Sequence, residues 1–124
     1  MKTITTANAP AAIGPYSQAK AFGNLIFTSG QIPLNPANGQ VVEGGIREQT
    51  LQTIKNLEAV LTEAGVGFEQ VLKTTCFLHD MADFAAFNEV YEQFFLSKPA
   101  RSCVAVKALP KGVLVEIEAI AVSA

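Results

Sequence analysis

The chain has 124 residues, of which 16% are charged and 49% apolar, and its formal net charge is −2. This length fits one domain, and the charged fraction lies well below the roughly 25% of typical soluble domains. The apolar fraction excludes an intrinsically disordered chain, and the lack of a basic excess disfavours nucleic-acid binding through the phosphate backbone. A domain this small buries only about two thirds of its unfolded surface, so apolar side chains must remain outside, which indicates self-association.

The residue content also limits the compartment and the metal sites that we expect. No uninterrupted apolar run is long enough to span a membrane, and residues 1–12 lack the apolar region of a signal peptide. Two cysteines, Cys76 and Cys103, predict reduced thiols in a cytoplasmic protein rather than a disulfide framework. Because His79 is the one histidine, no metal site of the usual Cys/His zinc type is expected.

The first predicted element is a β-hairpin. The pair Gly23-Asn24 separates residues 16–22 from residues 25–29, as a two-residue hairpin turn does. Two prolines and an Asn-Gly pair then mark residues 33–39 as an irregular loop or a second hairpin.

Two helices are predicted in the middle of the chain. In residues 46–64, the side chains that would form the buried face of a helix recur every three or four positions. Gly65 is well placed to end this helix. Asp80 or Asp83 can cap the second helix, and Pro99 prevents its continuation. Its apolar stripe also steps by three and four residues and comprises Phe84, Phe87, Tyr91 and Phe94.

The remaining segments predict strands. Residues 71–78 are rich in β-formers, and residues 102–106 and 113–122 flank a turn at 109–112, which predicts a C-terminal hairpin. The order hairpin, helix, strand, helix, hairpin predicts one α+β domain over residues 1–124, with a single mixed β-sheet and both helices packed on one face.

The last predicted strand is apolar on both of its faces, apart from two glutamates. A strand of a sheet that is half exposed should instead alternate between apolar and polar residues. Two helices can cover only one face of the sheet, so the second face needs another cover. A neighbouring subunit is the simplest supplier of it.

No phosphate-binding glycine motif is present in the chain. The candidate catalytic residues lie in the C-terminal strands. Arg101 begins one strand, and Glu116 and Glu118 interrupt the other. If the two strands form a hairpin with an even turn, Arg101 and Cys103 share a sheet face with both glutamates. This arrangement is either a structural ion pair or an arginine that anchors a substrate anion beside a carboxylate that acts as a general base.

Five segments of the sequence form a specific pattern when they are taken together. They are Ala9–Gln18, Thr28–Pro33, Phe87–Tyr91, Pro99–Val104 and Val115–Ala119. In this order and spacing the chain strongly resembles the RidA/YjgF family of reactive-intermediate deaminases over essentially its full length. The resemblance implies a chorismate-mutase-like fold and a homotrimer around a central barrel, with three active sites in clefts between subunits.

The implied activity is that of a 2-iminobutanoate/2-iminopropanoate deaminase. Such an enzyme hydrolyses 2-aminocrotonate or 2-aminoacrylate, through their imine tautomers, to 2-oxo acids and ammonia. These enamines leak from pyridoxal-phosphate dehydratases, but the deaminase itself is implied to need no cofactor. A held water and a proton relay suffice, because a protonated imine carbon is already electrophilic.

The resemblance also implies residue roles. Arg101 holds the substrate carboxylate with help from the backbone N–H of Gly30, and Glu116 positions and activates water. Further substrate-binding positions that line the cleft are Tyr16, Ser29, Asn88 and Cys103, the last as pocket lining rather than as a nucleophile.

Two other functions remain open from the sequence. A non-catalytic regulator that binds a 2-oxo acid or a partner protein would use the same cleft. An endoribonuclease that inhibits translation is disfavoured by the acidic balance and by the lack of a basic aromatic surface.

Overall fold

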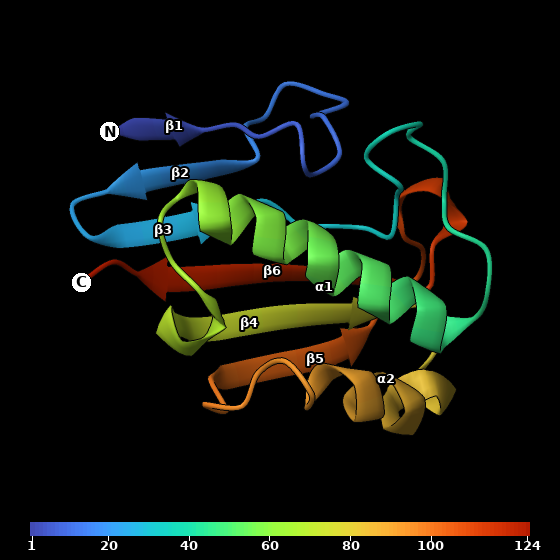
Figure 1. Ribbon diagram of the computed structural model, residues 1–124. Helices are drawn as coiled ribbons and strands as arrows, with labels where there is room; N and C mark the ends of the chain where they lie inside the picture. The colour runs from blue at the N-terminus through green and yellow to red at the C-terminus, as the bar shows by residue number, and fades with distance from the viewer.

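A computed structural model describes all residues, 1–124, and shows one six-stranded sheet with the strand order β1-β2-β3-β6-β4-β5 (Figure 1). All neighbours are antiparallel except β4 and β5, so the sheet is mixed, as predicted. The strands are β1 (Lys2–Ile4), β2 (Ala19–Phe22), β3 (Leu25–Thr28), β4 (Val71–Leu78), β5 (Ala100–Ala105) and β6 (Val115–Val122).

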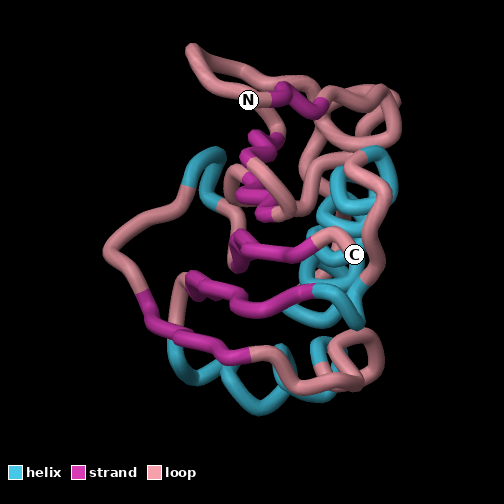
Figure 2. The backbone as a smooth tube through the Cα atoms, turned by 90° about the vertical axis from the view of Figure 1, so that its left-hand side faces the viewer, coloured by secondary structure: helices cyan, strands magenta, loops and turns pink.

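Two α-helices, α1 (Ile46–Glu63) and α2 (Phe84–Tyr91), pack against each other and on the same face of the sheet. Figure 1 shows α1 lying across the central strands, and Figure 2 shows it standing on one side of them. Three short 3-10 turns complete the structure, η1 (Phe68–Gln70), η2 (Met81–Asp83) and η3 (Pro110–Gly112). No helix is long and apolar enough to cross a membrane.

The core lies between the helices and the sheet, and β6 shows how it is divided. Alternate residues of β6 are fully buried toward the helices, namely Val115, Ile117, Ala119 and Ala121. The intervening side chains are only half buried and point to the face without helices. That open face carries several further apolar side chains, including Phe22, Phe27 and Val104, which are 71%, 45% and 47% exposed. The prediction of a second apolar face is therefore confirmed.

The turn and cap residues identified in the sequence agree with the observed turns and with most of the observed ends of helices and strands. Gly23 has φ +61°, which fits the first central position of a type II′ hairpin turn, and Gly65 follows α1 with φ +84°. Asp80 caps η2, where its carboxylate accepts the N–H of Ala82 at 2.9 Å. The second helix ends at Tyr91, earlier than Pro99 requires, and β1 was not predicted.

The predicted C-terminal hairpin is wrong. β5 pairs in parallel with β4, and β6 lies on the other side of β4, between β4 and β3. The burial of the strands gives the physical reason. In β4 the side chains of Thr74, Cys76 and Leu78 are fully buried, so this strand needs a neighbour on each side, whereas β5 is largely exposed and suits an edge.

Candidate functional site

Glu116 lies in a pocket of about 320 Å³ on the open face of the sheet. The pocket combines this one carboxylate with apolar walls and with two residues that follow β3. Its lining is Ile13, Tyr16, Ser29, Gly30, Ile32, Pro110 and Glu116. The structure thus brings together four of the residues predicted for the site, Tyr16, Ser29, Gly30 and Glu116.

The backbone after β3 fixes Gly30 beside Glu116. Gln31 and Ile117 exchange two backbone hydrogen bonds, of 2.8 and 3.1 Å, which form an isolated bridge to β6 beyond the end of β3. The Glu116 carboxylate rests on Gly30, so that a Cβ atom at this position would lie 2.1 Å from Oε2. Only glycine leaves room for this carboxylate, and the Gly30 N–H forms no hydrogen bond within the chain.

Tyr16 enters the pocket from a loop that one buried side chain holds in place. The Gln18 amide accepts the N–H of Thr6 at 2.7 Å and donates to the carbonyls of Thr6 and Pro10 at 3.1 and 2.8 Å. Ser29 donates its hydroxyl to the carbonyl of Ser17 at 2.6 Å, which ties this loop to the end of β3. The position of Tyr16 in the pocket wall is therefore fixed by the hydrogen bonds of Gln18 and Ser29.

On the opposite wall, Asn56 of α1 holds the loop after Gly30. Its amide donates to the carbonyls of Ile32 and Leu34 at 3.0 and 2.9 Å. Because Asn56 is buried, these bonds place Ile32 against the pocket from the helix side.

Burial raises the pKa of Glu116 above its ordinary value, and the negative charge of Glu118 raises it further. A carboxyl group whose pKa moves toward neutrality can both hold a proton and release one, as a proton relay requires. No hydrogen bond within the chain occupies the Glu116 carboxylate. It is thus free to bind a water molecule or a substrate group in the pocket.

Arg101 lies elsewhere, between the edge strand β5 and helix α2. It donates a hydrogen bond of 2.8 Å to Oδ1 of Asn88, and its guanidinium carbon is 4.8 Å from the ring centroid of Tyr91 and 5.5 Å from that of Phe84. These contacts orient the planar group and leave most of its N–H donors without a partner. Asn88 and Arg101, both predicted for the site, are therefore in direct contact.

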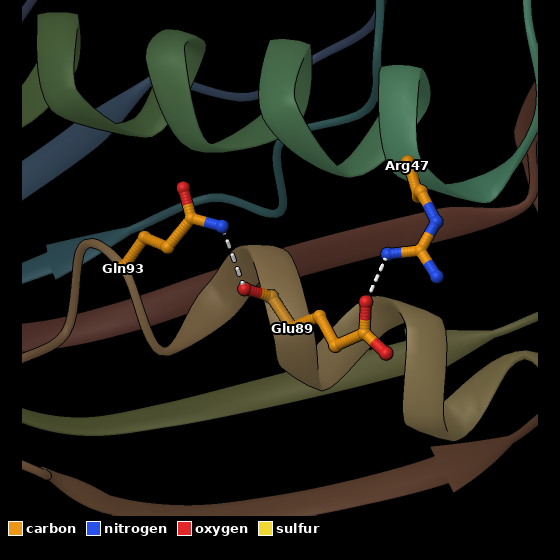
Figure 3. Close-up of polar contacts among 3 residues, drawn as sticks. All are labelled: Arg47, Glu89 and Gln93. Atoms are coloured by element: carbon orange, nitrogen blue, oxygen red, sulfur yellow. Dashed lines mark hydrogen bonds and ion pairs between the residues drawn. The ribbon is translucent and has the colours of Figure 1, made fainter.

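Arg101 has no carboxylate partner. The ion pair of the chain joins Arg47 of α1 to Glu89 of α2 at the exposed surface (Figure 3). The predicted alternative of a structural ion pair between Arg101 and a β6 glutamate is therefore wrong within one chain. A half-buried guanidinium that is held in place without a counter-charge is a fitting anchor for an anion.

The expectation that Arg101 and Cys103 share a sheet face with Glu116 and Glu118 is also wrong. Arg101 is the register partner of Thr74, which is in turn opposite Ala119, so all three point to the helix side. Glu116 is opposite Phe77 and points to the open side. The insertion of β4 between β5 and β6 removes the hairpin pairing on which the prediction depended.

Cys103 follows Arg101 by two residues and points the same way as its strand partner, Cys76. The neighbouring Cys76 thiol and the Arg101 charge lower the pKa of Cys103 to about 7, against the opposing effect of burial. Hydrogen bonding to Cys103 and burial raise the pKa of Cys76. Both cysteines are free thiols, and Cys103 is the one of the two that is partly exposed.

The sequence profile of the Endoribonuclease L-PSP family matches residues 6–123. The chain belongs to this family, the RidA/YjgF family. It is 55% identical to a candidate regulator from Lactococcus lactis named AldR, over 98% of this chain and 97% of that protein. It is 51% identical to the 2-iminobutanoate/2-iminopropanoate deaminase of Escherichia coli, also over 98% of this chain and 97% of that protein.

Solved structures from the RidA/YjgF family have the same fold. A candidate endoribonuclease from Thermotoga maritima superimposes with a TM-score of 0.98 at 47% identity, over 100% of this chain and 98% of that one. The Escherichia coli protein TdcF with bound serine superimposes with a TM-score of 0.95 at 44% identity, over 100% of both chains.

This RidA/YjgF chain thus carries its predicted site residues in two groups. Tyr16, Ser29, Gly30 and Glu116 form one on the open face, and Asn88, Arg101 and Cys103 form the other on the helix side. The sequence reasoning missed the apolar pocket residues Ile13, Ile32 and Pro110. Ile13 and Ile32 lie inside the segments that carry the family resemblance, but an isoleucine in a loop has no periodic pattern that distinguishes a pocket residue from a core residue.

Proposed function

We propose that this protein hydrolyses the C=N bond of small 2-imino acids, as a 2-iminobutanoate/2-iminopropanoate deaminase. The observation that carries the proposal is Arg101, a guanidinium oriented by Asn88 and aromatic rings and left without a carboxylate partner. A 2-imino acid supplies the planar carboxylate that such a fork binds. The deaminases of Escherichia coli and mouse, 51% and 52% identical to this chain, support the same reaction.

The active site is proposed to form between two copies of the chain. Arg101 and Glu116 point to opposite faces of one sheet, so one copy does not offer both to the same substrate. The apolar open face supports packing against a neighbour, since Phe27 and Val104 are otherwise left in water. We propose a homotrimer in which Arg101 of one subunit completes the Glu116 pocket of the next.

In this arrangement the substrate carboxylate binds Arg101 and the free N–H of Gly30 in the neighbouring subunit. The imine carbon then faces Glu116, whose carboxylate binds a water molecule and accepts its proton as the water attacks that carbon. The tetrahedral adduct loses ammonia when Glu116 passes that proton to the nitrogen and the new hydroxyl gives up its own proton as the C=O bond forms, which leaves a 2-oxo acid. The apolar walls provided by Ile13 and Ile32 take up the short side chain of the substrate.

The variant Arg101→Ala tests the anchor. Substrate is generated in place by a threonine dehydratase, and 2-oxobutanoate release is followed against semicarbazide trapping. The loss of a charge-assisted contact of roughly 2–4 kcal/mol lowers kcat/KM by a factor of about 30 to 1,000. Arg47→Ala, which removes the exposed arginine that pairs with Glu89, is the matched control and keeps wild-type activity. Wild-type turnover in Arg101→Ala would sink the proposal.

Subunit complementation tests where the site lies. Arg101→Ala and Glu116→Gln are each expected to keep only a small residual activity, at most a few per cent of the wild type, as pure proteins. When they are unfolded together and refolded as random trimers, about one quarter of the inter-subunit sites combine an intact Arg101 with an intact Glu116. Recovery of about one quarter of wild-type activity is expected, and no recovery contradicts a shared site.

A binding protein without turnover is the second candidate, and the relative named AldR favours it. Such a protein would bind 2-oxobutanoate at Arg101 but would not accelerate imine hydrolysis. Calorimetric binding together with a rate equal to the uncatalysed one would identify this case.

A further inference from the structure

Cys76 and Cys103 are direct partners across two neighbouring strands. They occupy the same register position on β4 and β5, so both side chains project from one face of the sheet. Neighbouring strands lie about 4.7–4.9 Å apart, and disulfides join Cα atoms that are about 4.4–6.8 Å apart. The backbone therefore already meets the spacing that a bond between these two sulfurs needs.

The two thiols differ in access. Cys76 is 0% exposed in the interior strand β4, whereas Cys103 is half buried on the edge strand β5. A small oxidant therefore reaches Cys103 first, and Cys76 then lies beside the oxidised sulfur. This order is the one that a reactive thiol and a resolving thiol require.

The charges around the pair favour a thiolate at Cys103. The groups that face it are Cys76 on β4, Arg101 on its own strand and Tyr91 on α2. The Cys76 thiol and the Arg101 charge stabilise the anion, while burial raises the pKa of Tyr91 and keeps that phenol neutral. The thiolate is the form of cysteine that attacks peroxides.

We propose that Cys103 is a peroxide-reactive modification site and that Cys76 resolves its oxidised form into a reversible intrachain disulfide. The Cys103 thiolate attacks one oxygen of hydrogen peroxide. An S–O bond forms, the O–O bond breaks and hydroxide leaves, so the peroxide is reduced and the sulfur becomes a sulfenic acid. The Cys76 thiol then attacks that sulfur, an S–S bond forms, and the departing hydroxyl takes the thiol proton and leaves as water.

This chemistry does not depend on the proposed deaminase activity, and its readout is mass. Reduced protein is treated with hydrogen peroxide and examined intact and after proteolysis. The wild type is expected to lose about 2 Da, the mass of two hydrogens, with one linked peptide pair that contains Cys76 and Cys103, and to recover its mass with dithiothreitol.

Two variants separate the roles of the thiols. In Cys76→Ser the sulfenic acid at Cys103 lacks its partner and is captured by dimedone. In Cys103→Ser the buried Cys76 stays unmodified. A disulfide between two chains in the wild type, or oxidation of Cys76 in Cys103→Ser, overturns the proposal.

Alkylation provides a measurement that needs no cysteine variant. Iodoacetamide is expected to label Cys103 in the folded wild type with a half-maximal rate near pH 7, and to label Cys76 only after unfolding in urea. Arg101→Gln shifts the midpoint for Cys103 to higher pH, because it removes a stabilising charge. Arg47→Gln, which alters the α1 arginine of the exposed ion pair with Glu89, leaves the midpoint unchanged. Equal labelling of the two thiols in the folded protein contradicts the proposal.

Discussion

The contact between Gly30 and Glu116 predicts that a methyl group at position 30 displaces the Glu116 carboxylate. In Gly30→Ala the new methyl carbon would lie 2.1 Å from Oε2 and 2.7 Å from Cδ of Glu116. Ordinary contact begins at 3.4 Å, so the carboxylate must withdraw by about 1.3 Å. The backbone does not oppose the substitution, because Gly30 is not among the glycines with positive φ.

A displacement of this size is large for the catalytic role that we propose for Glu116. Misplacing a reacting group by about 1 Å costs on the order of 100-fold in rate, which corresponds to about 2.7 kcal/mol of transition-state stabilisation. We therefore expect kcat/KM of Gly30→Ala in the coupled dehydratase assay to fall about 100-fold. Its free energy of unfolding is expected to change by less than about 1 kcal/mol, since a flexible side chain absorbs the clash.

Gly14→Ala is the matched control. Gly14 belongs to the loop that carries Tyr16, and its added methyl would meet that ring at 3.5 Å, an ordinary contact. This variant is expected to keep wild-type activity within about a factor of three. Full activity of Gly30→Ala in a folded protein would refute the argument that the carboxylate must stay on this glycine.

A double-mutant cycle shows whether the effect passes through Glu116. If the methyl acts by displacing the carboxylate, Gly30→Ala costs nothing further once Glu116→Gln has removed the charge. If the residual activity of Glu116→Gln falls another 100-fold, the methyl blocks the substrate directly. That outcome contradicts the reasoning from the 2.1 Å contact.

Two further predictions concern stability. The folded pKa of Glu116 is raised above its unfolded value of about 4.3, so the folded protein holds its proton more tightly and loses stability as pH rises through the window above that value. In urea unfolding, the free energy of unfolding of Glu116→Gln should therefore rise relative to that of the wild type between pH 4 and pH 7. A difference between the two free energies that does not change with pH contradicts this. Gln18→Ala leaves buried backbone groups of residues 6–10 without their hydrogen-bond partner, and it should lower the free energy of unfolding by roughly 2–4 kcal/mol. Gln93→Ala removes one exposed hydrogen bond to the carbonyl of Glu89 and should change it by less than about 0.5 kcal/mol (Figure 3).

The elements that depend on nearby residues were predictable from the sequence. The periodicity of residues 46–64 predicted α1 to within one residue at each end, because burial of one face alone selects a period of 3.6. The alternation along residues 113–122 predicted a strand with two apolar faces, and β6 has one face buried under the helices and one open. Lys2–Ile4 was missed because a strand of three residues contains too little pattern to stand out, and only its pairing with β2 identifies it.

Strand order was not predictable in the same way. Residues 100–105 and 115–122 are close in sequence, and a hairpin is the shortest way to pair two such strands. The alternative places β4 between them, and it is favoured because β4 buries apolar residues that an edge could not cover. That advantage comes from residues some 25 to 50 positions away, which local turn signals do not report.

The error in strand order changes the meaning of the two candidate catalytic residues. On the predicted hairpin, Arg101 and Glu116 would lie on the same sheet face of one chain, so one copy could offer both to the same substrate. In the structure they point to opposite faces, Arg101 has no carboxylate partner and Glu116 lies in the pocket of the open face, which carries exposed apolar side chains. Under the proposed trimer, the low charge content of the chain follows from the need for an apolar interface. If Arg101 of one subunit reaches Glu116 of another, as we propose, the surface that joins them has to be apolar enough to hold the subunits together.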